Sequence, residues 1–206
     1  FIADRGVSPL SVTDAQVIAL NYSVVPTESI IYTNDGESMQ APYPEKVLQL
    51  WEAPIRQTAA MVSLLRDARS RTAGIGIKMS SLSESSHLFS GNAIVDSVWY
   101  VFLPGHGGMF IQQTENYWPF LQQVAFPAWR SSANSWRGRW LGDLTAGPGA
   151  LGTAAVSGSS GRFAGLELEA VESLSVDAFS TEHGFVSAEG QLLVALPRDA
   201  NEADVD

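Results

Sequence analysis

The chain has 206 residues, 45% hydrophobic and 10% aromatic, which is enough to bury the core of one domain. Its 12 basic and 22 acidic residues give a formal net charge of −10, which disfavours binding to nucleic acid and to anionic membrane surfaces. The absence of cysteine excludes disulfides and thiolate nucleophiles, and no apolar run reaches the roughly 18 residues of a membrane span. We therefore expect a soluble protein and slightly favour the cytoplasm.

The first 43 residues carry two competing signals. The stretch "SVTDAQVIAL" fits the start of a helix capped by Thr13, with Gln16 three positions later. The overlapping stretch "VIALNYSVV", and "ESIIYT" after it, are rich in residues that favour strands. Both alternatives stay open at the level of sequence.

Residues 54 to 72 are predicted to form a helix. Pro54 suits a first helical turn, and Gly74 suits a stop. Apolar residues recur at helical spacing, and arginines gather near the C-terminal end, where they would complement the helix dipole: Ile55, Ala59, Val62 and Leu65, then Arg66, Arg69 and Arg71. We divide the chain into an N-terminal segment (1–74) with this helix, a β-barrel domain (75–197) and an acidic tail (198–206).

From residue 75 the sequence favours strands separated by glycine-rich turns. The predicted strands include "GIGIKM", "NAIVDSVWYVFL", "MFIQQT", "SWRGRWLGDLT", "GTAAVSG", "RFAGLELEAV", "LSVDAF" and "GFVSAEGQLLVALP". A short helix is expected over "YWPFLQQVAFPAW", started by Pro119 and broken before Pro127. The fold class is α+β and mainly β, with a single antiparallel β-barrel of calycin or allene oxide cyclase-like type.

Two apparent catalytic motifs near residue 150 do not hold. Residues 147 to 152 match G-x-G-x-x-G, but "TAAVSGSSG" after them cannot form the amphipathic helix of a dinucleotide site. Residues 158 to 161 are not G-x-S-x-G, and strand-like sequence follows them, so the nucleophile turn of hydrolases is absent. Hydrolase, dehydrogenase and kinase functions are therefore disfavoured.

The stretch "AAVSGSSGRFAGLELEA" resembles the glycine-rich hairpin of allene oxide cyclase-like and dirigent-like barrels. In those families a strand enters a G-x-[ST]-G-x-F-x-G turn and leaves as another strand, and the matching positions here are Gly158, Ser160, Gly161, Phe163 and Gly165. A further glycine usual in the family is replaced by the segment Leu166-Glu167-Leu168. The resemblance spans residues 152 to 196 and implies a barrel in which glycines allow the turn and the aromatic ring plugs the interior.

Five of the six tryptophans lie within 42 residues, among other aromatic residues. A large aromatic core explains this clustering, and so does an apolar ligand cavity with a few polar groups. For the second alternative we predict these ligand-binding residues: Trp99, Phe102, Asn116, Trp118, Trp129, Trp136 and Trp140.

Three residues are candidates for proton transfer. Glu115 is the sole acidic residue between Asp96 and Asp143 and lies among aromatic residues, where desolvation would raise its pKa. Tyr117 would be its polar neighbour. His106, in "LPGHGG", lies on a glycine-flanked turn where it would be accessible. The alternatives are that Glu115 caps the following helix and that His106 is an exposed turn residue.

Two functions agree with this sequence. The first is a cofactor-independent isomerase or cyclase that encloses a small hydrophobic substrate. Such a reaction depends mostly on the shape of the cavity and on proton transfer, so it leaves little sequence motif. The second is a non-catalytic carrier of a hydrophobic ligand or an interaction subunit. The histidines have no metal-ligand spacing, so we expect neither a metal nor a cofactor, and a homo-oligomer is compatible with either function.

Overall fold

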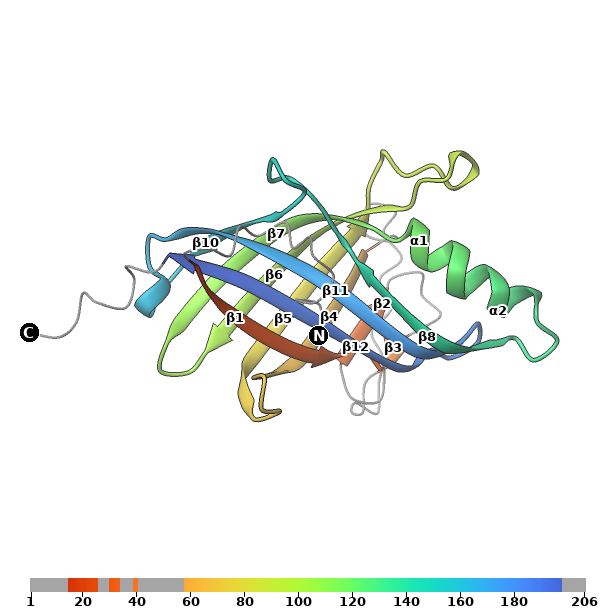
Figure 1. The fold of residues 1–206 in the computed structure, drawn as a ribbon, viewed down its shortest axis with the longest axis horizontal. Helices are drawn as coiled ribbons and strands as arrows, with labels where there is room; N and C mark the ends of the chain where they lie inside the picture. The colour runs from red at the N-terminus through yellow and green to blue at the C-terminus, as the bar shows by residue number, and fades with distance from the viewer. Residues whose placement is uncertain (1–14, 26–29, 34–38, 41–57, 198–206) are drawn as a thin grey trace, which may run out of the picture.

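The computed structural model describes residues 15–25, 30–33, 39–40 and 58–197, and in these the protein is mainly β. Figure 1 shows long strands that curve around a common interior. The strands are β1 (Ala15–Ser23), β2 (Ile30–Thr33), β3 (Met39–Gln40), β4 (Thr58–Arg66), β5 (Thr72–Leu82), β6 (Ile94–Leu103), β7 (Gly107–Asn116), β8 (Ser135–Asp143), β9 (Thr145–Gly147), β10 (Ala154–Gly158), β11 (Glu167–Ser180) and β12 (Gly184–Pro197).

Eight of these strands form a closed antiparallel barrel, as the sequence predicted. Their order is β1-β12-β11-β10-β7-β6-β5-β4, and the pair Asn21–Arg66 between β1 and β4 closes the ring. β2 and β3 extend the sheet beyond β4, while β8 pairs with β11 and β9 pairs with β7. The N-terminal ambiguity is resolved in favour of strands, and the barrel takes β1 and β4 from residues before 75.

The predicted helix over 54–72 is wrong. Residues 58 to 66 form β4, which pairs with β5 along its whole length, and residues 54 to 57 lie outside the described part of the chain. β4 is apolar on both faces: Met61 and Leu65 are buried, while Leu64 is half exposed. The strand therefore lacks a clean two-residue alternation, and its apolar residues imitate helical spacing.

The arginines after β4 belong to a tight turn and not to a helix end. Asp67 accepts hydrogen bonds from the backbone N–H groups of Arg69 and Arg71, each at 2.9 Å. Its other oxygen accepts two bonds from the Arg71 guanidinium, at 2.9 and 2.7 Å. This network holds the β4–β5 hairpin, with Ser70 at φ 60°.

A helical segment between β7 and β8 lies at one end of the barrel (Figure 1). It comprises α1 (Trp118–Phe120), the π-helical stretch η4 (Leu121–Ala125) and α2 (Phe126–Arg130). The predicted helix is thus present, but it continues through Pro127, and the π-helical stretch η4 directly precedes α2 and this proline. Phe120, Val124 and Ala128 are buried on one face at four-residue spacing, and this face packs on the barrel.

The glycine-rich hairpin joins β10 to β11 through the short helix η5 (Gly161–Phe163). Gly161 and Gly165 have φ of 62° and 73°, a region that favours glycine. A Cβ at Gly158 would lie 1.5 Å from the Phe163 carbonyl oxygen, so the turn closes directly on this residue. Phe163 is 4% exposed and belongs to the core. The prediction that this stretch is a hairpin of the barrel is confirmed, although Arg162 and Phe163 lie in η5 and the second strand begins at Glu167.

The last points concern membrane-spanning helices and the C-terminal tail. Within the described residues, no helix has the length and apolar composition needed to cross a membrane. The predicted acidic tail, residues 198 to 206, falls outside them.

Candidate functional site

Three barrel strands each direct one charged side chain into the interior. In β7 the residues with inward-facing side chains are Met109, Ile111, Gln113 and Glu115, and in β11 they include Leu168, Ala170, Glu172 and Leu174. In β5 the inward positions are Gly74, Gly76 and Lys78, while Ile75, Ile77 and Met79 point outward. Because side chains alternate between faces along a strand, these phases bring one lysine and two glutamates into a single interior.

The three charges form one buried ion-pair cluster. The Lys78 ammonium nitrogen lies 2.5 Å from Glu115 Oε1 and 2.7 Å from Glu172 Oε1. Lys78 is 7% exposed, and both glutamates have no exposed surface. The ammonium also lies 5.4 Å from the centroid of the Trp99 ring. Charges buried this deeply are tolerated because they are paired and hydrogen-bonded.

Glu172 has a full set of hydrogen-bond donors. Its Oε1 accepts bonds from Lys78 and from the Tyr22 hydroxyl. Its Oε2 accepts bonds from Trp99 Nε1 at 3.0 Å and from Gln113 Nε2. Burial alone would raise the pKa of Glu172, but the Lys78 charge and the hydrogen bonds from Lys78 and Tyr22 hold it below its usual value. Glu172 is therefore a fixed carboxylate that holds the cluster together.

Glu115 is partnered on one oxygen alone. Oε1 accepts hydrogen bonds from Ser97 Oγ at 2.7 Å and Gln113 Nε2 at 2.6 Å, besides its contact with Lys78. Oε2 is buried and has no hydrogen-bond partner among the described residues. Burial raises the pKa of Glu115 to about 7, against the lowering effect of Lys78. This carboxyl group can therefore exchange a proton near neutral pH.

Lys78 behaves as a permanent cation. Burial would lower the pKa of its ammonium, but the charges of Glu115 and Glu172 outweigh this effect and raise it. Tyr22 and Tyr117 have pKa values well above the ordinary value, first because of burial and then because of the neighbouring carboxylates. Both tyrosines therefore remain neutral hydroxyl donors.

A cavity of about 180 Å³ lies next to this cluster. Its polar lining comprises Tyr22, Lys78, Ser80 and Tyr117, and the rest of its wall is apolar: Val24, Ala59, Met61, Leu144, Leu174 and Phe185. The volume is below the range typical of drug-sized ligands, so the cavity suits a small, mostly apolar molecule with one polar group.

The structure brings together three of the predicted site residues. Glu115 lies near the end of β7 and Tyr117 directly follows this strand, while Trp99 donates to Glu172 within the same cluster. His106 lies elsewhere, in the β6–β7 turn, and lines a different cavity at the opposite end of the barrel. His106 therefore does not share a site with Glu115, and its role in proton transfer stays a prediction.

The other aromatic candidates divide between the helix and the outer surface. Trp140 is buried against Phe120, with ring centroids 5.6 Å apart, and donates to Gln123 Oε1 at 3.1 Å. Trp118 packs on Phe126, Asn116 Oδ1 accepts from the Trp118 backbone N–H, and Trp136 packs against the core. Phe102 and Trp129 are 43% and 70% exposed. These residues do not surround one cavity, and their roles in ligand binding remain predictions.

Sequence analysis missed Lys78, Glu172 and Tyr22. A signal for two of them was present: Lys78 follows two glycines on alternate positions of "GIGIKM", and Glu172 shares its phase with Leu168, Ala170 and Leu174. A charged residue in the inward phase of a barrel strand indicates a buried polar site. The sequence alone did not show which phase of β5 faces inward, because Ile75, Ile77 and Met79 are apolar and yet point outward.

No cluster of three or more His, Asp or Glu side chains suited to holding a metal ion occurs in the part of the chain that the structure describes. The titratable side chains described in the interior are Lys78, Glu115, Glu172, Tyr22 and Tyr117.

No family model matches the chain, and no curated protein matches it. A solved structure described as a nonspecific heme-binding cyclase, which catalyses a [4 + 2] cycloaddition during neoabyssomicin biosynthesis, is similar to it with a TM-score of 0.41 and 10% identity. The match covers 93% of this chain and 68% of that one. At this level the similarity assigns no function, and what the sequence and structure establish is the closed antiparallel barrel.

Proposed function

We propose that the protein is a cofactor-independent isomerase or cyclase that encloses a small hydrophobic substrate in the cavity beside Lys78 and Tyr117. The observation that carries this proposal is Oε2 of Glu115, a buried carboxylate oxygen without a hydrogen-bond partner among the described residues. An unpartnered buried oxygen costs folding free energy, and such costs are concentrated at functional sites. The resemblance of the 158–165 hairpin to allene oxide cyclase-like barrels agrees with this class of reaction.

The chemistry we infer is the movement of a proton between two carbons of an unsaturated carbonyl compound. The Glu115 carboxylate removes a proton from the carbon next to the carbonyl group, and the electrons of that C–H bond pass into a dienolate. The Tyr117 hydroxyl and the Lys78 ammonium donate hydrogen bonds to the oxygen as its negative charge develops. Glu115 then returns the same proton to a more distant carbon, so that atoms and charge balance without a co-reactant.

The proposal is tested with cyclohex-3-enone, a small apolar ketone that isomerises to the conjugated cyclohex-2-enone and gains ultraviolet absorbance. We expect the protein to accelerate this conversion over buffer, and Glu115→Gln to lose about 100-fold or more of the acceleration. Tyr117→Phe should retain part of it. Glu167→Gln, at an exposed glutamate of β11, is the matched control and should retain all of it.

A carrier is the competing function, and the same experiment separates the two. If the protein binds cyclohex-3-enone but does not accelerate its conversion, or if Glu115→Gln converts it as fast as the unaltered protein does, the enzyme proposal fails. Native mass spectrometry of the purified protein then provides the test of a carrier, since a hydrophobic molecule bound in the barrel should co-purify with it.

A further inference from the structure

The outer side of the sheet β4–β5–β6–β7 carries an unusual number of apolar side chains. Thirteen large hydrophobic side chains are exposed among the described residues, and six of them lie on these four strands, with exposed fractions from 39% to 58%: Leu64, Ile75, Ile77, Met79, Phe102 and Phe110. Single exposed apolar residues are ordinary, whereas a contiguous patch of them marks an interaction site. The register of the strands decides which case applies.

The register joins these side chains into three adjacent rows, which we call the apolar face. Residues paired across neighbouring strands lie side by side on one side of the sheet. The rows are Leu64–Ile75–Phe102, then Val62–Ile77–Tyr100–Phe110, then Ala60–Met79–Val98–Gln112. None of these eleven residues is charged, and the rings of Tyr100 and Phe110 contact each other with centroids 4.8 Å apart. The exposed apolar residues therefore form one continuous patch.

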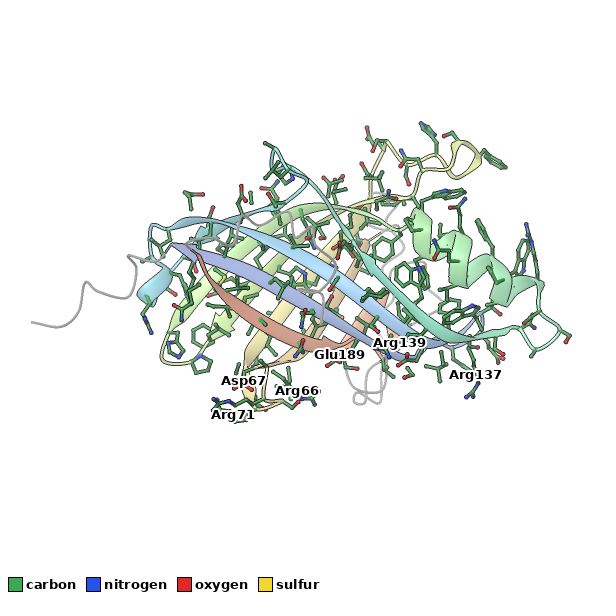
Figure 2. The ribbon with its side chains drawn as sticks, in the orientation of Figure 1. Arg66, Asp67, Arg71, Arg137, Arg139 and Glu189 are labelled. Atoms are coloured by element: carbon green, nitrogen blue, oxygen red, sulfur yellow. The ribbon has the colours of Figure 1, made fainter. Side chains whose placement is uncertain are left out.

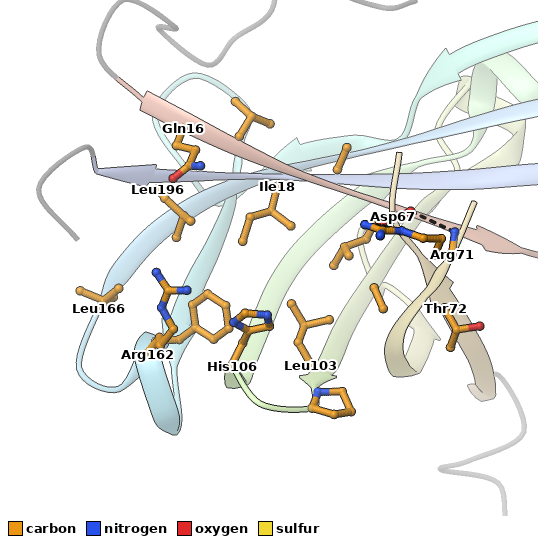
Figure 3. Close-up of a pocket in the computed structure, with 16 residues that line it drawn as sticks. Gln16, Ile18, Asp67, Arg71, Thr72, Leu103, His106, Arg162, Leu166 and Leu196 are labelled. Atoms are coloured by element: carbon orange, nitrogen blue, oxygen red, sulfur yellow. Dashed lines mark hydrogen bonds and ion pairs between the residues drawn. The ribbon is translucent and has the colours of Figure 1, made fainter. Parts of the chain in front are cut away.

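Charged side chains lie around the margin of the apolar face. Arg66 follows Leu64 at the end of β4 (Figure 2), and beyond it Asp67 and Arg71 bind each other (Figure 3). Asp96 pairs with Ser81 in the row after the third one. An apolar centre with a polar margin is the usual composition of a protein interface. Because the chain carries a net charge of −10, an uncharged centre lets two copies meet without burying like charges.

The size of the apolar face suits a dimer. At roughly 200 Å² for a large side chain in water, six that are about half exposed present on the order of 600 Å² of accessible surface. A stable interface buries about 800 Å² of each partner. Val62, Val98 and Tyr100, which are partly exposed, and the polar margin add to the apolar centre. One face of this size, met by an identical face, reaches the area of a standard interface.

The apolar face is also complementary to itself in shape. A hollow of about 580 Å³ is lined by all four residues of the third row and, beyond them, by Thr58 and Pro148 among others. Half-exposed side chains, Phe102 among them, project from the first row. A two-fold axis that crosses the strands at the second row exchanges the first and third rows, so that the projecting row of each copy meets the hollow of the other. A second copy of the chain therefore supplies both halves of the fit.

We propose that the apolar face is the interface of a symmetric homodimer, in which two copies of this chain pack their β4–β7 sheets face to face, about 10 Å apart. The interface lies on the outer side of the barrel, whereas the Glu115 cluster lies inside it. The dimer is thus independent of the proposed catalysis.

The test is sedimentation velocity of the full chain over a range of concentrations, in which the unaltered protein should form a dimer. Ile77→Glu, in the central row, should raise the Kd of the dimer about 100-fold or more, because each dimer would bury two unpaired carboxylates. Val186→Glu is the matched control. Val186 is 48% exposed on β12, outside the apolar face, so the same kind of substitution there should leave the Kd unchanged.

A second measurement needs no substitution, and it decides the question if thermal melting shows that Ile77→Glu does not fold. Met79 is 58% exposed, whereas Met61 and Met109 are buried, so hydrogen peroxide should oxidise Met79 faster than the other two. In the proposed dimer the second copy covers Met79. Its oxidation, followed by mass spectrometry, should therefore slow in proportion to the fraction of dimer as the protein concentration rises.

Three results would overturn the proposal: a monomer at every concentration up to about 100 µM, a dimer equally tight in Ile77→Glu and in the unaltered protein, or oxidation of Met79 at a rate independent of concentration. Incubation with phosphatidylcholine vesicles tests another occupant. A monomer that binds these vesicles, and loses this binding in Ile77→Glu but not in Val186→Glu, would assign the apolar face to lipid and likewise contradict the dimer.

Discussion

The ammonium group of Lys78 lies 2.5 Å from the Glu115 carboxylate, although the two residues are on β5 and β7, with β6 between them. Lys78 pairs across the sheet with Trp99, and Glu115 pairs with Val95, so the two side chains meet diagonally over β6 inside the barrel. Barrel curvature brings them together with Glu172 from β11. This contact links the stability of the fold to its candidate chemistry.

Removing the cation of this cluster should be strongly destabilising. Lys78→Met leaves two buried carboxylates without a counter-charge, which typically costs about 3–5 kcal/mol of unfolding free energy. Urea denaturation measures the loss. The double variant Lys78→Met/Glu115→Gln should recover part of it, since one of the uncompensated charges is then removed. Additive effects of the two substitutions would show that the two groups do not interact.

The contribution of Glu115 to the stability of the protein should decrease as the pH rises from about 4.5 to about 7. Burial raises the pKa of Glu115 from 4.5 to about 7, so over this interval the folded state binds more protons at this group than the unfolded state does. The unfolding free energy of the unaltered protein, measured against that of Glu115→Gln at each pH, isolates this contribution. A difference that stays constant across the interval would contradict the raised pKa.

The proposed isomerase activity should depend on pH in the opposite direction. Glu115 must be a carboxylate to remove a proton from carbon, so kcat/KM for cyclohex-3-enone should rise through a pH of about 7 and then level off. The profile of the His106→Gln variant should be the same, because His106 lines the other cavity. If the pH profile changes in His106→Gln, the titrating group is linked to His106 at the other end of the barrel, which contradicts our assignment to Glu115.

Gly161→Val should destabilise the protein more than Gly105→Val. Both glycines have positive φ, 62° and 78°, so valine is strained at both positions. At Gly161 a Cβ would also lie 2.3 Å from the His106 carbonyl oxygen, whereas at Gly105 it would meet nothing within 4 Å. Thermal melting compares the two variants. Equal melting temperatures would mean that the close approach of the hairpin to the β6–β7 turn has no energetic weight.

Trp140→Ala should cost about 3–5 kcal/mol, as expected for a buried aromatic residue. Trp140 is 6% exposed and packs edge-to-face on Phe120, which in turn contacts Phe179 and Phe185. Trp129→Ala is the control: this side chain is 70% exposed, and its loss should change the unfolding free energy by about 0.5 kcal/mol or less. Chemical denaturation measures the unfolding free energy of both variants and shows which of the two tryptophans contributes to the core.

Much of the fold was predictable because barrel strands carry local signals. The stretch "GFVSAEGQLLVALP" coincides with β12, and the turn glycines at 161 and 165 do have positive φ. Backbone conformation at a glycine and alternation along a strand are properties of neighbouring residues, so sequence alone reports them. β4 was missed because it is apolar on both faces, and a strand of that kind has no alternation to detect.

The candidate site was also predictable from the sequence only in part. Sequence identified Glu115 as a carboxyl group among aromatic residues, a feature of its immediate neighbours, and the structure places it in the interior. Its pairing with Lys78 and Glu172, residues 37 and 57 positions away in sequence, depends on strand order and on which face of β5 turns inward. No local pattern encodes either, because Ile75, Ile77 and Met79 point outward and two glycines leave room for Trp99 and Leu103. Barrel closure, which is a property of all eight strands together, decided that these three charges share one buried interior.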